Sequence, residues 1–335
     1  MKKFVFVIAI LMIALFAFAG CKSDTPAQEA PPAATDTQTE TPAAPEPASD
    51  DGIRIGFVMN STAHPYTMAL ETFAKQKAAE LGVEVTVVDA QMDAQKMVDM
   101  INQFVAQGYD AIMCSPVDVN SNLPAYKAAK EAGVFIVEVS GNSEGDTFDL
   151  VDAVVYADQH EEGRWAAEAL VAVLPDGGNV VVLQGALGSS GQIGRDSGFD
   201  EYLADKPEYV ILDRQTTDWM RDKAMSIMED YLTRYNNIDA VYGHDDIMVA
   251  GAFEAIHAAG RTGIVSVAIG ASADAVALIK AGDLTSTVDQ PPNYEGSFGL
   301  ELAYRLVKGE QVEKINHDVL GIVNADNVDS FTAVW

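Results

Sequence analysis

The chain has 335 residues, 48% of them hydrophobic, and a formal net charge of −29. This is enough apolar material for a well-packed core in two domains or in one large domain. Because nucleic-acid binding requires clustered Lys and Arg to neutralise phosphates, the strong negative charge argues against a nucleic-acid partner.

A secretory signal peptide is expected over residues 1–20. Positive charge in MKK precedes the apolar run FVFVIAILMIALFAFA, which leads into FAGC at Cys21. The small residues before Cys21 resemble a bacterial lipobox, although Phe18 stands where leucine is usual. This predicts that Cys21 is lipidated and anchors the protein to the bacterial membrane. The protein would then lie at the outer face of the cytoplasmic membrane or in the periplasm. The alternative is a plain membrane anchor, since the run is nearly long enough to span a bilayer.

Residues 21–52 are predicted to form a disordered tether from the lipidated Cys21. They are rich in Ala, Pro, Thr and acids and show no apolar periodicity. The other cysteine is Cys114 in DAIMCSP, so no internal disulfide is expected. We expect Cys114 to be a small buried apolar residue at the end of a strand.

From residue 53 onward, short β-branched runs alternate with amphipathic stretches. This alternation predicts βαβ units with parallel sheets covered on both faces. A first series of strands is expected at 53–60, 84–90, 110–116 and 134–140, and a second at 153–158, 178–185, 209–215, 240–245, 265–270 and 284–290. The clearest helices are expected at 65–81, 94–107, 121–132, 160–174 and 292–308.

The residues just after the predicted strands are mostly polar and neutral, with a few acids, one arginine and two aromatics. In open parallel sheets, ligands bind beyond the carboxyl ends of the strands. Carboxylates and amides bind hydroxyls, arginine donates several hydrogen bonds, and aromatic faces cover C–H groups. This mixture of side chains suits a polyhydroxylated ligand.

Residues 53 to about 325 resemble the periplasmic sugar-binding proteins of ABC importers, in particular the ribose-binding proteins. The resemblance depends on the order and spacing of NSTAHPYTMALETFAKQKAAELG, LQGALGSSGQIGRDSGF, GHDDIMVAGAFEAIHAAG and STVDQPP. It implies the type I periplasmic binding protein fold, an α/β fold with two similar doubly wound parallel-sheet lobes and a three-stranded hinge. The implied N-terminal lobe is 53–156 plus 291–320, and the C-terminal lobe is 157–290 plus 321–335.

The same resemblance implies a non-enzymatic solute-binding lipoprotein that closes on a sugar or sugar-like molecule and docks on ABC permease subunits. The implied ligand-binding residues are Asn60, His64, Tyr66, Ser115, Ser140, Asn142, Arg195, Trp219, Asp245 and Gln290. Arg195 would donate to ligand oxygens, and Tyr66 and Trp219 would sandwich its apolar face, with lobe packing as the alternative for Trp219. Asp245 would accept ligand hydroxyls while Asp246 caps the following helix. His244 either lines the cleft or supports the turn.

Three charged groups of the ribose-type pattern are missing. Ser140 and Gly141 stand where that pattern has an Asp-Arg pair, and Gly270 stands where it has an Asp. Since charge-assisted hydrogen bonds contribute roughly 1.5–3 kcal/mol each, their loss argues against ribose itself. We expect a larger or less hydroxylated ligand to fill the room at Gly141 and Gly270, with Asn142 as a substitute donor.

Two other functions fit parts of the sequence. One is a binder of a nucleoside or another non-sugar signal that feeds a sensor or chemoreceptor. The other is a secreted hydrolase using Asp245 and Asp246, which is disfavoured because adjacent residues diverge at a strand end. No cofactor is expected, and no metal, because HDD at 244–246 has no companion ligands at useful spacing. A monomer is expected.

Overall fold

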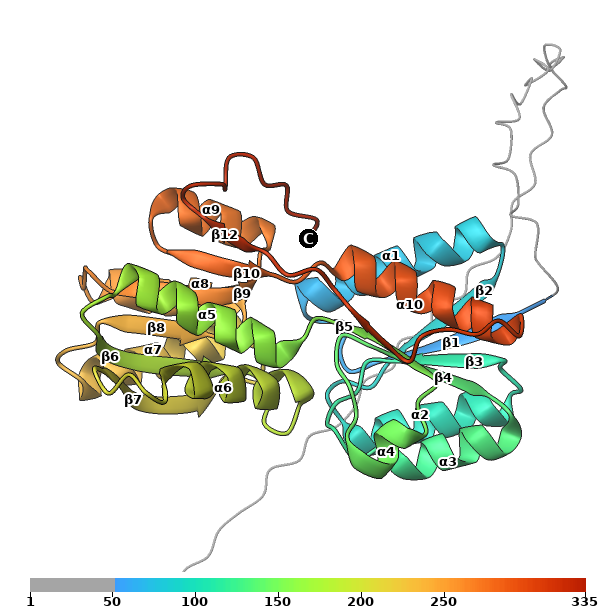
Figure 1. Cartoon of the computed structure of the whole chain (residues 1–335). Coiled ribbons are helices and arrows are strands. Elements are labelled where there is room, and N and C mark those ends of the chain that lie inside the picture. Colours follow the sequence, from blue (N-terminus) through green and yellow to red (C-terminus); the bar gives the residue numbers. More distant parts are fainter. Residues whose placement is uncertain (1–51) are drawn as a thin grey trace, which may run out of the picture. The chain divides into compact units, whose positions relative to one another are not determined.

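The computed structural model describes residues 52–335 and contains two six-stranded sheets (Figure 1). The expected signal peptide, Cys21 and the tether up to residue 51 lie outside the described residues. Each sheet has helices on both faces, and this confirms the predicted class of two doubly wound α/β lobes.

The first sheet has the strand order β11-β5-β4-β3-β1-β2, and all its neighbouring strands are parallel. Its strands are β1 (Arg54–Met59), β2 (Glu84–Asp89), β3 (Ala111–Cys114), β4 (Phe135–Val139), β5 (Ala153–Tyr156) and β11 (Ile315–His317). The helices of this lobe are α1 (Pro65–Leu81), α2 (Ala94–Ala106), α3 (Leu123–Ala132), α4 (Gly145–Asp149) and α10 (Pro292–Val307).

The second sheet has the order β12-β10-β9-β8-β6-β7, and only β12 runs antiparallel to its neighbour. Its strands are β6 (Gly178–Gln184), β7 (Tyr209–Thr216), β8 (Ala240–Gly243), β9 (Val265–Gly270), β10 (Ser286–Asp289) and β12 (Ile322–Asn324). Its helices are α5 (Gln159–Val173), α6 (Ser190–Leu203), α7 (Arg221–Arg234), α8 (Asp246–Ala258) and α9 (Ala273–Ala281).

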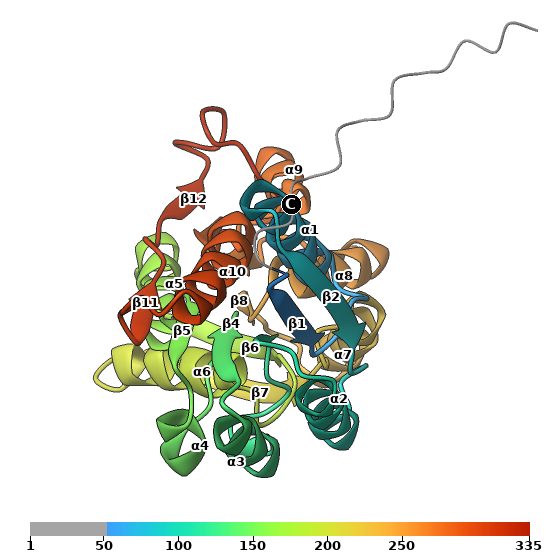
Figure 2. The same ribbon diagram turned by 90° about the vertical axis from the view of Figure 1, so that its right-hand side faces the viewer.

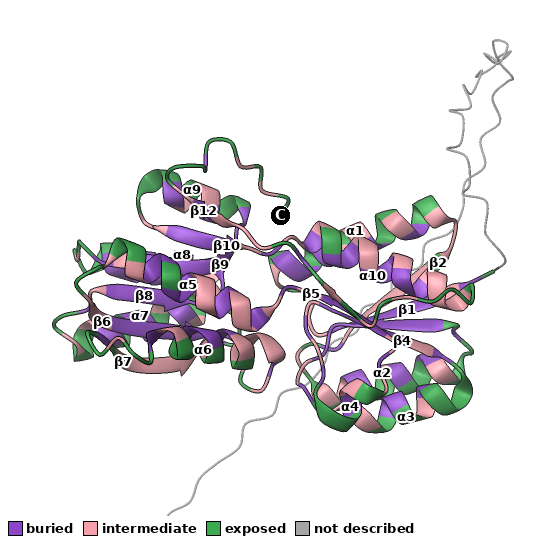
Figure 3. Cartoon of the chain, viewed as in Figure 1, coloured by how far each residue is buried: buried purple, intermediate pink, exposed green. Residues whose placement is uncertain are grey.

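Each sheet separates two apolar cores. In the first lobe, α1 and α10 lie side by side over one face, and α2 and α3 cover the other (Figures 1 and 2). In the second lobe, α5 and α6 cover one face and α7, α8 and α9 the other. The central strands are therefore buried from both sides (Figure 3), which is why their sequences are almost continuously apolar.

The chain passes between the two sheets three times, between β5 and α5, between β10 and α10, and between β11 and β12 (Figure 1). The predicted three-stranded hinge is therefore present. Strand β5 opened the second series in the sequence, but it pairs with β4 in the first sheet, which agrees with the implied N-terminal lobe of 53–156. Helix α4 and strands β11 and β12 were not predicted, because elements of three to five residues carry little periodicity.

Helix caps place the loops at the carboxyl ends of the strands. Helix α1 begins with Pro65 after His64, whose Nδ1 accepts a hydrogen bond from the Tyr66 N–H, and it ends at Gly82 in the left-handed region. Helices α5 and α6 are capped in the same way by Asp158 and Ser189. Each of these helices thus starts at the edge of the sheet where ligands bind in α/β folds.

The described residues 52–335 include no helix with the length and apolar character of a membrane span. Cys114 is fully buried at the end of β3, as predicted, and carries a free thiol.

Candidate functional site

Three of the expected ligand residues are neighbours at the carboxyl edge of the first sheet. Val58 pairs with Cys114, and Cys114 with Glu138, so Asn60, Ser115 and Ser140 follow adjacent strands. The Ser115 Oγ is buried and has no hydrogen-bond partner. Ser140 has a φ of 63°, a left-handed conformation that is uncommon outside glycine and turns the chain sharply at this edge.

His64 and Tyr66 extend this edge from the start of α1. The Nδ1 of His64 accepts the Tyr66 N–H, so the neutral imidazole carries its proton on Nε2. That Nε2 is buried without a hydrogen-bond partner and lies 3.5 Å from Oδ1 of Asp245 in the second lobe. The Tyr66 hydroxyl donates to Oε2 of Glu295 at 2.5 Å, which fixes the ring. The imidazole therefore faces Asp245 of the other lobe, at a distance longer than a hydrogen bond within the protein normally has.

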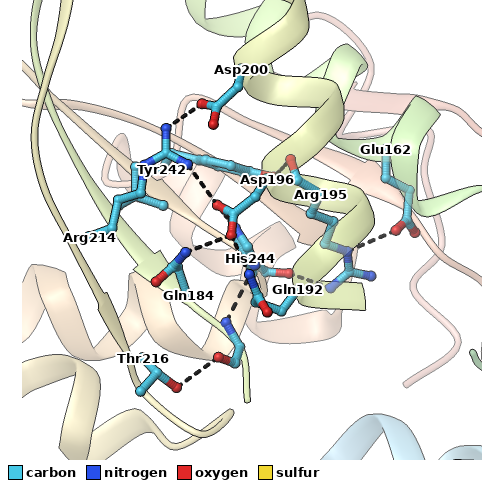
Figure 4. Close-up of polar contacts among 12 residues, drawn as sticks. Glu162, Gln184, Gln192, Arg195, Asp196, Asp200, Arg214, Thr216, Tyr242 and His244 are labelled. Atoms are coloured by element: carbon cyan, nitrogen blue, oxygen red, sulfur yellow. Dashed lines mark hydrogen bonds and ion pairs between the residues drawn. The ribbon is translucent and has the colours of Figure 1, made fainter. Parts of the chain in front are cut away.

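Arg195 on α6 is the centre of the second lobe's edge (Figure 4). Its Nε donates to Oε2 of Glu162 at 2.8 Å, its Nη1 to the carbonyl oxygen of His244 at 2.6 Å, and its Nη2 to Oε1 of Gln290 at 2.8 Å. The guanidinium has five N–H donors, so two remain for other acceptors. Arg195 is thus held rigidly by the protein before any ligand arrives.

A second layer of contacts fixes the loop that carries His244. The Gly185 N–H donates to Nδ1 of His244, and its Nε2 lies 3.3 Å from Oδ1 of Asp196. Asp196 also accepts from Gln184 and Gln192 at 2.6 Å and from Arg214 at 3.0 Å (Figure 4). Burial lowers the pKa of His244, so its imidazole is neutral. The question left open by the sequence is settled: His244 is fully buried and supports the turn.

Of the two adjacent aspartates, Asp245 has the capping role that was expected of Asp246. Asp245 caps α8, because its Oδ1 accepts the Ile247 N–H at 2.9 Å. Asp246, which we expected to be the cap, is fully buried and accepts from the Ser272 N–H at 2.9 Å and from the Thr287 hydroxyl at 2.7 Å. Asp246 therefore joins α8 to β9 and β10. With such different partners, the two carboxylates do not form a catalytic pair.

The glycines at the two departures from the ribose-type pattern do not leave empty room. A Cβ on Gly141 would lie 2.9 Å from the Ser190 Oγ, and a Cβ on Gly270 would lie 2.7 Å from Oδ2 of Asp246 and 2.9 Å from Cζ2 of Trp335. The protein's own side chains therefore occupy the room that we expected beside these glycines, and the larger or less hydroxylated ligand stays a prediction.

Asn142 contacts the second lobe through its backbone. Its N–H donates to the Ser190 Oγ at 3.2 Å, a contact between the lobes, and its side chain donates to the Ser143 carbonyl. With Gln159 and Ser190 it lines a groove of about 150 Å³. Asn142 therefore faces the junction of the lobes at α5 and α6, and its amide is already engaged locally.

Trp219 has a φ of 63° and lies after β7. A Cβ on Gly185 would lie 2.1 Å from its indole, so a glycine is required there for the ring to pack. The Arg195 guanidinium carbon lies 5.6 Å from the ring centre, within the range of a cation–π contact. The indole thus packs against Gly185 in the second lobe and also lies beside Arg195.

Glu295 was missed by sequence reasoning, yet it contacts two of the three hinge segments. Its Oε1 accepts the Ala157 N–H at 3.1 Å and lies 3.4 Å from the amide nitrogen of Gln290. Burial raises the pKa of Glu295, and burial together with the charge of Glu295 raises the pKa of Asp318 in the third segment. In the sequence both acids read as solvated charges, because nothing local reveals their burial.

Metal binding finds no support in residues 52–335, where no group of three or more His, Cys, Asp or Glu residues is arranged to hold an ion.

Comparison with known proteins identifies a family and two curated relatives. Residues 55–311 match the family described as periplasmic binding protein domain. The chain is 33% identical over 286 residues to the xylitol-binding protein of Mycolicibacterium smegmatis, covering 84% of this chain and 80% of that protein. It is 31% identical over 314 residues to the ribose import binding protein RbsB of Bacillus subtilis, covering 94% of this chain and 96% of that protein.

Solved structures give the same picture. The TM-score is 0.80, with 28% identity, to a galactofuranose binding protein, covering 83% of this chain and 96% of that one. The TM-score is 0.81, with 26% identity, to an ABC transporter solute binding protein from Bacillus halodurans with bound myo-inositol. That match covers 85% of this chain and 99% of the other.

Proposed function

We propose that the chain binds a sugar or polyol between its lobes for an ABC importer. The proposal proceeds from the family, since the chain belongs to the periplasmic binding protein domain family. Support comes from relatives named for xylitol and ribose binding and from a structural neighbour with bound myo-inositol. All three names describe small, neutral, polyhydroxylated molecules.

The observation that carries the proposal is unused hydrogen-bonding capacity on both edges. The first lobe offers the Ser115 Oγ and the His64 Nε2, both buried without hydrogen-bond partners. The second lobe offers the two remaining N–H groups of Arg195. Buried polar groups are costly to leave unsatisfied, and ligand hydroxyls would satisfy both donors and acceptors.

Charge favours a neutral ligand over an anionic one. Arg195 is paired with Glu162 at 2.8 Å, and Asp245 and Glu295 are buried nearby. A phosphate or carboxylate would therefore meet no uncompensated positive charge from Arg195. Asn60, Tyr66, Ser140, Asn142, Trp219, Asp245 and Gln290 complete the proposed ligand-binding set.

Hinge closure is the proposed binding mechanism. Contacts between the lobes, such as His64 with Asp245 and Asn142 with Ser190, form only when the two edges approach. A ligand that bridges the edges would favour the closed state by its differential affinity. The closed protein would then dock on the permease subunits as a monomer.

A lipid anchor at Cys21 is part of the same proposal, since solute must be captured outside the cytoplasm. Cys21→Ser should abolish lipid labelling and release the protein from the membrane fraction. Labelling of the variant would contradict the anchor without affecting the binding proposal.

The function can be tested by thermal shift with pentoses, hexoses, polyols and inositols, with nucleosides and amino acids as controls. Ligand at about 100 times its Kd should stabilise the fold by about 2.7 kcal/mol, or roughly 5–10 °C for a protein of this size. Ribose should rank below the best compound. Stabilisation by nucleosides or amino acids alone, or conversion of a bound sugar to product, would contradict the proposal.

A further inference from the structure

The last segment of the sequence runs from β12 past α9, and Trp335 lies where the two lobes meet (Figure 1). Its main-chain oxygen accepts the Ala273 N–H at 2.7 Å, and its indole Nε1 donates to the Gly270 carbonyl at 3.2 Å. The two anchors are the last residue of β9 and the first residue of α9, both in the second lobe. Trp335 is therefore fixed on the carboxyl edge of the second sheet.

The indole reaches the first lobe at two residues of the proposed site. Its ring centre lies 5.3 Å from that of Tyr66 in an edge-on arrangement and 6.2 Å from that of His64. The side chain is only partly buried. An aromatic face is thus placed beside the unused Nε2 of His64, between the edges that would enclose a ligand.

Gly270 and Trp335 are complementary. A Cβ at Gly270 would lie 2.9 Å from the indole, and Gly270 has a φ of 136°, which side-chain-bearing residues rarely adopt. The aspartate that the ribose-type pattern has at this position could not coexist with the indole as it lies. At this place the chain has therefore replaced a hydroxyl acceptor by an aromatic surface.

We infer that Trp335 is a wall of the ligand cleft and determines specificity. It favours a ligand that presents C–H or methyl groups toward the indole over one that presents a hydroxyl there. An aromatic face packs well against C–H groups, whereas a hydroxyl pressed against it loses its hydrogen bond to water without replacement. This inference rests on the proposed binding of sugars and polyols.

The test uses calorimetric titration of the full chain with sugars and polyols in pairs, each hydroxy compound with its deoxy counterpart. The wild type should prefer the deoxy member of at least one pair by roughly tenfold. Trp335→Ala should reduce that preference, and weaken binding of the preferred member, by roughly three- to tenfold. Val334→Ala is the matched control, because the Val334 side chain is exposed, and it should retain the wild-type preference.

Melting temperatures of the two variants separate an effect on the site from a loss of folding. If Trp335→Ala is folded and keeps the wild-type affinities and preference, Trp335 only fastens the end of the chain to α9, and the inference is wrong while the proposed function stands. If the wild type binds neither member of any pair, the proposed function fails and the inference with it.

Discussion

The carboxyl edges of the two sheets differ in the network that holds their side chains. In the second lobe, Arg195 makes three hydrogen bonds to Glu162, His244 and Gln290, and Asp196 holds the layer behind it. In the first lobe, Ser115 and His64 are buried with polar atoms that have no hydrogen-bond partner. Two atoms of the second edge, the Glu162 Oε1 and the His244 Nε2, also lack a hydrogen-bond partner, so the edges differ in the network that holds Arg195 and not in the presence of unsatisfied atoms. The second edge is thus preorganised by that network, and both edges have capacity that a ligand could use. Substitutions in the second lobe should therefore cost stability as well as affinity, and those in the first mainly affinity.

The largest effect is expected for Arg195→Ala. The substitution leaves the Glu162 carboxylate buried without its ion pair, at a cost of about 3–5 kcal/mol of unfolding free energy. Affinity should fall roughly tenfold to a hundredfold or more. Denaturant unfolding measures the loss of stability, and calorimetric titration measures the loss of affinity. Wild-type stability of Arg195→Ala would contradict the preorganised network.

The hinge between the edges should make stability depend on pH. Burial raises the pKa of Asp289 from 3.8 to about 6, and burial also raises the pKa values of Glu295 and Asp318. Raised carboxyl pKa values mean that the folded state binds more protons than the unfolded state. This stabilisation is complete below the unfolded pKa values and is lost as pH rises through the folded ones.

Melting temperature should therefore decrease from pH 5 to pH 8, on the order of 5 °C. Glu295→Gln keeps an acceptor for the Tyr66 hydroxyl but cannot titrate, so it should flatten this decrease. Melting curves in buffers of matched ionic strength measure the pH dependence of the melting temperature for the wild type and for Glu295→Gln. A melting temperature that rises from pH 5 to pH 8 would show that these acids are not protonated in the fold.

Ser115→Ala tests the first-lobe edge. The Ser115 Oγ has no hydrogen-bond partner within the protein, so its removal should leave stability unchanged or slightly higher. A lost hydrogen bond to ligand would weaken affinity by about 0.5–1.5 kcal/mol, or roughly two- to twelvefold. Unchanged affinity would remove Ser115 from the ligand-binding set.

An effect of similar size, on stability, is expected at Asp245, where the edges meet. Asp245→Ala removes the cap of α8 and should cost about 1 kcal/mol of stability, whereas Asp245→Asn can still accept the Ile247 N–H. Comparing the two variants separates the cap from the contact with His64. Equal stability of the Ala and Asn variants would show that the cap contributes little.

The sequence predicted the elements well wherever they were long. Helix α1 was expected over 65–81 and is found at Pro65–Leu81, because proline at its start, glycine at its end and a clear break in pattern define it locally. The pairing of strands was harder to predict. Strand β5 looked like the start of a new series, but it lies between β4 and β11 in the first sheet. Which strands pair depends on contacts that no single segment reveals.

The sequence by itself determined the order of strands and helices and the placing of polar residues at the carboxyl ends, because periodicity and caps act over a few residues. The tertiary structure decided what those residues do. Asp246 is buried by partners 26 and 41 residues away, and Trp335 reaches Gly270 across 65 residues. Burial and hydrogen-bond partners are properties of the packed chain, so neighbours such as Asp245 and Asp246 can have opposite roles.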